Sequence, residues 1–62
     1  MLIEVAQNLP HYGGWRGVLN GLVGSTSAQG KVYSVSIMPP PFTGEAVEVY
    51  LPASVLRRLA PP

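Results

Sequence analysis

Hydrophobic and polar residues alternate along two stretches of the chain with the two-residue period of a β-strand. In residues 31–38, Tyr33, Val35 and Ile37 fall on one face. Residues 46–51 alternate in the same way. The apolar face of this second stretch comprises Val47, Val49 and Leu51. The pattern predicts two well-defined β-strands.

Two other stretches predict strands of less regular form. Residues 2–6 alternate weakly and predict a first strand. Residues 15–25 are largely apolar but are interrupted by Gly17, Gly21 and Gly24, and glycine at this density disfavours a helix. In a strand, glycine marks a bulge, a sharp bend or the close approach of another backbone. We therefore expect a bent second strand.

Proline and glycine mark the connections between these strands. Residues 7–14 are a predicted long loop, and residues 25–30 are a predicted turn. The three prolines of residues 39–41 predict a stiff, polyproline-like connector. Residues 52–56 suit a single helical or 3₁₀ turn, because proline is tolerated in the first turn of a helix. Residues 57–60 then follow as a short last strand.

This order of elements is the pattern of an SH3-like small β-barrel. We predict an all-β fold of about five strands with a 3₁₀ turn before the last strand. Residues 1–62 are short enough to form only one domain. Closure of the sheet into a barrel would remove most of the unpaired strand edges.

The size and composition of the chain favour association with another polypeptide. A chain of 62 residues buries only about 60% of the surface that its unfolded form exposes. Small domains compensate with disulfides, a metal or oligomerisation, but this chain has no cysteine, one histidine and three acidic residues. Charged residues make up 11% of the chain, against about 25% in an average domain. We therefore predict exposed apolar patches that contact the chain itself or another protein.

Charge and hydropathy argue against two other classes of partner. The net charge is +1, which is too small for the clustered Lys and Arg of a general nucleic-acid binder. The sequence contains no apolar run of the length that spans a membrane. Glu4 interrupts the apolar start of the chain, where a signal peptide needs a continuous apolar segment. We expect a cytoplasmic protein that binds neither membrane nor nucleic acid.

The polar residues do not form a recognisable catalytic or metal-binding set. His11 is the only histidine, and no acid or cysteine lies within five positions of it. We interpret His11 as an exposed loop residue. The serines have no base adjacent in the sequence that would activate them as nucleophiles. We therefore assign no catalytic and no metal-binding residue.

Aromatic residues are the candidates for contact with a partner. Tyr12 and Trp15 lie on the long first loop, where SH3 domains carry aromatics that bind proline-rich peptides. Phe42 follows the three prolines. We assign Tyr12, Trp15 and Phe42 to a predicted interaction surface. The alternatives are a core or subunit-interface role for Trp15 and Tyr33, and stacking on single-stranded bases.

Two adjacent arginines lie near the end of the chain. Arg57 and Arg58 alternate in direction if they lie on a strand. We expect one to point to solvent and the other to pair with Glu45 or Glu48 across the sheet.

Three segments of the chain resemble the plasmid-borne type II dihydrofolate reductases, which are small SH3-like barrels. The matching segments, within residues 13–59, are GGWRGVLNGLV, GKVYSVSI and VEVYLPASVLRRL. Residues 15–17 match the tryptophan–x–glycine of that family, and residues 33–35 match its Tyr-x-Val strand. Residues 47–50 match its Val-Gln-Ile-Tyr strand, and Pro52 follows after one inserted leucine.

The resemblance implies a homotetramer in which four barrels surround a pore where NADPH and dihydrofolate bind. Such a pore catalyses chiefly by orienting its two ligands. Carried over to this chain, the binding residues would be Glu48, Val49 and Tyr50. Glu48 stands where the family has glutamine, and an ionised glutamate only accepts hydrogen bonds. Residues 5–12 lack the lysines that hold anionic ligands in the family.

Four like charges around a pore would repel one another and the anionic ligands. Our leading hypothesis is therefore a non-enzymatic SH3-like barrel that works through protein association and needs no cofactor. It would act as a homo-oligomer or as a small subunit or accessory protein of a larger complex. The alternative is a homotetramer of the type II dihydrofolate reductase kind that uses NADPH, so the sequence leaves open whether the chain is an enzyme.

Overall fold

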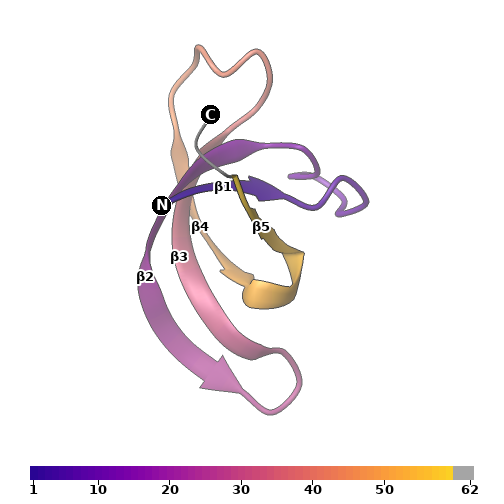
Figure 1. Ribbon diagram of the computed structural model, residues 1–62, viewed down its shortest axis with the longest axis vertical. Helices are drawn as coiled ribbons and strands as arrows, with labels where there is room; N and C mark the ends of the chain where they lie inside the picture. The colour runs from indigo at the N-terminus through magenta and orange to yellow at the C-terminus, as the bar shows by residue number, and fades with distance from the viewer. Residues whose placement is uncertain (60–62) are drawn as a thin grey trace.

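A computed structural model describes residues 1–59 and consists of five antiparallel strands and one short 3₁₀ helix (Figure 1). The elements are β1 (Leu2–Val5), β2 (Arg16–Thr26), β3 (Gly30–Met38), β4 (Val47–Pro52), η1 (Ala53–Val55) and β5 (Leu56–Arg58). The strands form one sheet in the order β4-β3-β2-β1-β5. In this part of the chain, no helix is long and apolar enough to cross a membrane.

The predicted all-β fold with a 3₁₀ turn before the last strand is confirmed. The two alternating stretches of the sequence lie in β3 and β4 within one residue of the predicted limits. The last strand is shorter than expected because β5 ends at Arg58. Residue 60 of the predicted last strand lies outside the described residues.

The long β2–β3 hairpin provides most of the curvature of the sheet (Figure 1). The pairing of these strands is shifted twice, between Leu19 and Gly21 and between Leu22 and Gly24. An extra residue in one strand bends it and increases its twist. The expected bending of the second strand at glycines is therefore confirmed.

The core is small and lies on the inner, concave face of this sheet. Its fully buried members are Ile3, Val5, Val35 and Ile37, and Leu51 is 8% exposed. Partly buried apolar residues surround it, among them Tyr12, Trp15, Leu19, Tyr33 and Val49. The face of β3 that the sequence pattern identified therefore carries two of the four fully buried side chains.

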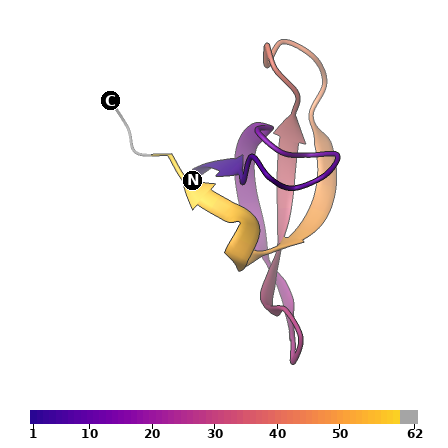
Figure 2. The same ribbon diagram turned by 90° about the vertical axis from the view of Figure 1, so that its right-hand side faces the viewer.

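The sheet does not close into a complete barrel. β4 pairs with β3, and β5 pairs with β1, but the two outer strands of the order are not hydrogen-bonded to each other. Figure 2 shows β4 (orange) and β5 (yellow) on opposite sides of the curved sheet. The expectation that closure removes most strand edges is therefore wrong, because η1 turns the chain towards β1 and no strand among residues 1–59 pairs with the outer side of β4.

Candidate interaction surface

The pairing of β3 with β4 divides the predicted binding residues between the two faces of the sheet. Val49 lies opposite the fully buried Val35, so it faces the core. Glu48 lies opposite Ser36 and points to the outer face, as does Tyr50 two positions further along the strand. Tyr50 is 64% exposed. The structure therefore brings Glu48 and Tyr50 together on one surface and separates Val49 from them.

A polar network crosses the outer face from β2 to β4. The side-chain amide of Asn20 donates to Ser36 Oγ at 2.9 Å and to Ser34 Oγ at 3.2 Å. Ser34 Oγ in turn donates to Glu48 Oε2 at 2.6 Å. One oxygen of the Glu48 carboxylate is thus held by the neighbouring strand.

Ser34 has an acidic partner, Glu48, that the sequence analysis did not predict. The two residues are 14 positions apart, so only the register of β3 and β4 brings them together. Ser34 is 6% exposed, so a substrate cannot reach its Oγ, although Glu48 accepts its hydrogen bond. A nucleophile must reach its substrate and have a base that takes its proton. The pair is therefore a structural contact, with no geometry for nucleophilic attack.

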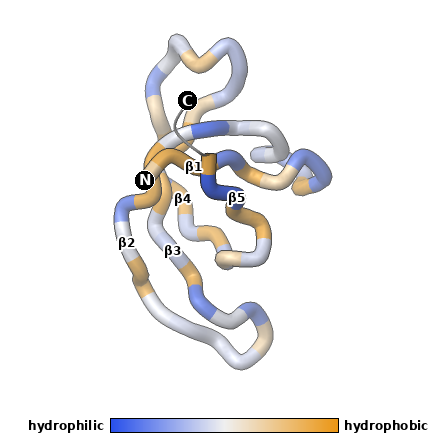
Figure 3. The backbone as a smooth tube through the Cα atoms, viewed as in Figure 1, coloured by the Kyte–Doolittle hydropathy of each residue, from blue (hydrophilic) through white to orange (hydrophobic). Residues whose placement is uncertain are grey.

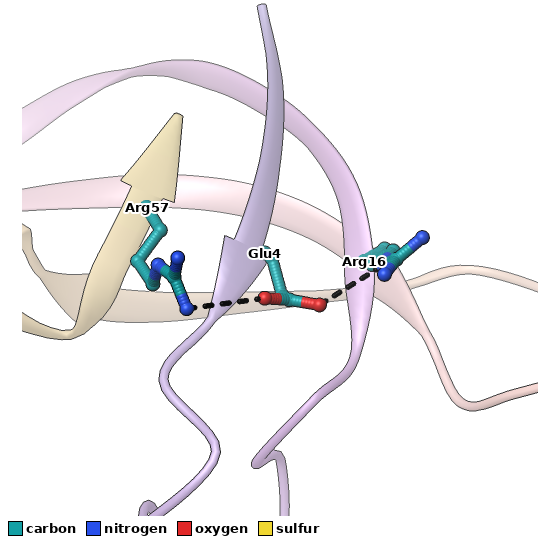
Figure 4. Close-up of polar contacts among 3 residues, drawn as sticks. All are labelled: Glu4, Arg16 and Arg57. Atoms are coloured by element: carbon teal, nitrogen blue, oxygen red, sulfur yellow. Dashed lines mark hydrogen bonds and ion pairs between the residues drawn. The ribbon is translucent and has the colours of Figure 1, made fainter. Parts of the chain in front are cut away.

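A buried carboxylate lies between two arginines (Figure 4). The register of β1, β2 and β3 places it on the same outer face of the sheet. Glu4 is 7% exposed, and its Oε2 lies 3.0 Å from Arg16 Nε. Its Oε1 lies 3.7 Å from Arg57 Nη1. Both arginines are direct cross-strand neighbours of Glu4, one on β2 and one on β5. Pairing in this way compensates the cost of removing a charge from water.

This arrangement corrects the expected partner of the paired arginines. The sequence suggested Glu45 or Glu48, but Arg57 pairs with Glu4. The physical reason is the topology: β5 lies beside β1 and not beside β4, which carries Glu48. Arg58 lies on the next position of β5 and is exposed.

The three aromatics of the predicted interaction surface fall into two groups. The Tyr12 and Trp15 rings meet edge to face with centroids 5.0 Å apart, and both residues are half-buried against the core. Phe42 instead lies beneath the guanidinium of Arg16, whose Cζ is 5.1 Å from the ring centroid. The half-buried position of Trp15 agrees with the alternative role in the core. The role of the three residues in binding stays a prediction.

An apolar groove of about 400 Å³ lies beside Arg16 on the outer face. Its lining residues are Leu2, Arg16, Gly17, Val18, Met38, Phe42 and Leu59. Leu2 is 58% exposed and Val18 is 44% exposed, so large apolar side chains face solvent here. In Figure 3 the tube is strongly hydrophobic where the chain enters β1, next to this groove. Phe42 is half-buried, and it is the predicted contact residue that lines this groove.

No group of three or more metal-binding side chains occurs within residues 1–59. No protein-family model, no curated protein and no solved structure matches this chain. The resemblance to type II dihydrofolate reductases rests on the motif residues quoted above and on the small all-β fold, and it stays a prediction.

Proposed function

We propose that this protein is a non-enzymatic SH3-like barrel that works by binding a polypeptide, either itself or the larger complex of which it is a small subunit. The observation that carries the proposal is the number of large apolar side chains left in solvent. Seven of them are 43–64% exposed: Met1, Leu2, Val18, Leu22, Val23, Val47 and Tyr50. Among residues 1–59, the buried core has five apolar members. Burial of these exposed side chains against a partner would stabilise the complex by about 25 cal/mol for each Å² of apolar surface removed from water.

The distribution of charge supports the same proposal. Three of the seven acidic and basic residues, Glu4, Arg16 and Arg57, are used in one ion-pair cluster. Few ionised groups therefore remain over the rest of the surface. Protein interfaces are depleted of charged residues at their centre, so a surface of this composition suits contact with another protein.

Sedimentation equilibrium of the full 62-residue chain tests the proposal. We expect a homo-oligomer at micromolar concentration, or a stoichiometric complex when the chain is purified with an identified partner. A folded chain that stays monomeric up to millimolar concentration and copurifies with no stoichiometric partner would overturn it.

The reductase alternative makes a different prediction for an enzyme assay. We expect no oxidation of NADPH in the presence of dihydrofolate, and no growth of bacteria that express the chain on trimethoprim. The reason is the anionic side chain of Glu48 on the outer face, which would repel anionic ligands gathered in a pore. Glu48→Gln removes this charge and is the matched control. Measurable NADPH oxidation by the unaltered chain would replace our proposal with the reductase.

A further inference from the structure

The outer side of β4 is an open sheet edge. Within the described residues, the backbone hydrogen bonds of β4 are those of its ladder with β3. The remaining backbone hydrogen bonds, which join loops and other strands, include none from residues 47–52. No side chain of this part of the protein donates to or accepts from the backbone of β4 either. Backbone N–H and C=O groups on such an edge are a template for another strand.

The two edges of the sheet are protected to different degrees. β5 has only three residues and carries Arg57 and Arg58. Short length and basic side chains are common ways to prevent the pairing of an edge strand. β4 has six residues, of which Glu48 is the only charged one, and it includes Val47 and Val49. The β4 edge is therefore the one that is suited to accept a strand.

Building on the association proposed above, we propose that a second copy of this chain pairs antiparallel along β4. The twofold axis passes between the Val49 residues of the two copies. An antiparallel pair with a twofold axis perpendicular to the sheet is self-complementary. Directly opposed side chains lie on the same face of the joined sheet, and side chains alternate between faces along a strand. Two opposed positions must therefore differ by an even number of residues. The axis then passes between two copies of the same residue. The sheets of the two subunits then form one continuous sheet of ten strands, twice the five observed in one chain.

The side chains of β4 select Val49 among the possible centres. An axis through Glu48 would place two carboxylates directly opposite each other, and like charges in this position are destabilising. An axis through Tyr50 would place Glu48 opposite Pro52 of the partner subunit, which has no N–H to donate. An axis at Val49 separates the two carboxylates and places Pro52 opposite position 46, which precedes β4, so its missing N–H lies outside the paired strands.

In the register centred on Val49, each Glu48 lies opposite Tyr50 of the partner subunit on the outer face. Glu48 Oε2 accepts from Ser34, so Oε1 of the same carboxylate has no hydrogen-bond partner among residues 1–59. Tyr50 is 64% exposed and carries a phenolic donor. On the inner face, Val47 lies opposite Leu51 of the partner subunit. This pairing would cover Val47, which is 43% exposed in the single chain.

Sedimentation equilibrium of three variants tests the pairing and its register. Tyr50→Glu places like charges opposite each other twice per dimer, so we expect the dimer dissociation constant to rise at least tenfold. Adding Glu48→Lys to Tyr50→Glu makes the opposed charges complementary, and we expect the constant to return to within about threefold of the unaltered value. Ser25→Glu is the matched control, because it introduces the same charge at an exposed polar residue of β2 that is not among the exposed apolar residues. It should leave the constant unchanged.

A cross-linking experiment gives a second readout that does not depend on charge. The chain contains no cysteine, so single cysteines can be introduced without side reactions. A mixture of Glu48→Cys and Tyr50→Cys chains should form the mixed disulfide in preference to either symmetric one, because these positions are opposed only across the twofold axis. Circular dichroism of each variant establishes that it is folded, and the cross-link decides the outcome if Tyr50→Glu does not fold.

The results that would contradict pairing along β4 differ from those that would contradict the proposed function in protein association. A dimer that Tyr50→Glu does not dissociate would overturn pairing along β4 and leave the proposed function intact. Dissociation by Tyr50→Glu without recovery in the double variant, or symmetric disulfides only, would overturn the register and with it the proposed twofold axis. A chain that is monomeric at every concentration would overturn pairing along β4, and the proposed function would then depend on a different polypeptide as partner.

Discussion

Gly17→Ala is expected to destabilise the protein by about 3 kcal/mol, the upper end of the usual cost of inserting an atom into a packed site. Gly17 lies in β2 directly opposite Ile37 of β3, where the two backbones approach closely. A Cβ atom at this position would overlap the carbonyl oxygen of Ser36 and would lie 2.8 Å from the Cα atom of Ile37. Both atoms belong to the backbone of β3, so the clash can be relieved only by separating β2 from β3.

The matched control for this variant lies in the same strand. A Cβ atom added to Gly21 meets no other atom within 4 Å, and the φ of this residue is outside the left-handed region. Gly21→Ala is therefore expected to leave stability unchanged or to raise it by up to about 1 kcal/mol, because alanine restricts the unfolded chain. Urea unfolding at a fixed protein concentration, followed by the fluorescence of Trp15, measures both. Equal midpoints for the two variants would show that β2 and β3 are farther apart at Gly17 than described.

Ile37→Ala is expected to cost about 2–5 kcal/mol, the usual range for truncating a buried isoleucine. Ile37 is fully buried, and it belongs to a core with only five buried apolar residues. The total stability of a 62-residue domain is roughly 3–9 kcal/mol, so the loss removes a large part of it. We expect the variant to be partly unfolded near body temperature.

A graded pair of substitutions checks that the loss comes from burial. Ile37→Val should cost about 0.5–1.5 kcal/mol. Leu22→Ala changes a residue that is 57% exposed and should stay within about 0.5 kcal/mol of the unaltered protein. Thermal unfolding by circular dichroism at one protein concentration ranks the three. A larger cost for Leu22→Ala than for Ile37→Ala would mean that the hairpin, and not the described core, holds the fold together.

The fold was predictable because its signals are local in sequence. The alternation in residues 31–38 and 46–51 depends only on the two-residue period of a strand, and both strands form there. Glycines interrupt β2 where its pairing with β3 shifts. The 3₁₀ turn at residues 53–55 follows from a proline at its start. Each of these features depends on the residue types within a short segment. Contacts between distant segments therefore changed few of the predicted elements.

The surface was less predictable because it depends on which strands become neighbours. Sequence spacing gave no reason to pair Glu4 with Arg57, which are 53 positions apart, and the sheet order alone brings them together. The contact between Ser34 and Glu48 depends in the same way on register. Phe42 was grouped with Tyr12 and Trp15 by residue type, yet it lies under Arg16. Whether a sheet closes is also a property of the whole chain, and here β4 and β5 stay apart.

The net charge of the protein equals that of the cluster around Glu4, and this small charge affects how whole molecules behave in concentrated solution. The cluster of Glu4, Arg16 and Arg57 contributes a net charge of +1, which equals the formal net charge of the entire chain. The remaining acids and bases cancel, and the isoelectric point is about 8.2. Proteins with so small a net charge repel one another weakly and tend to precipitate. The protein should therefore be least soluble in mildly alkaline buffer and should remain dispersed more readily under acidic conditions.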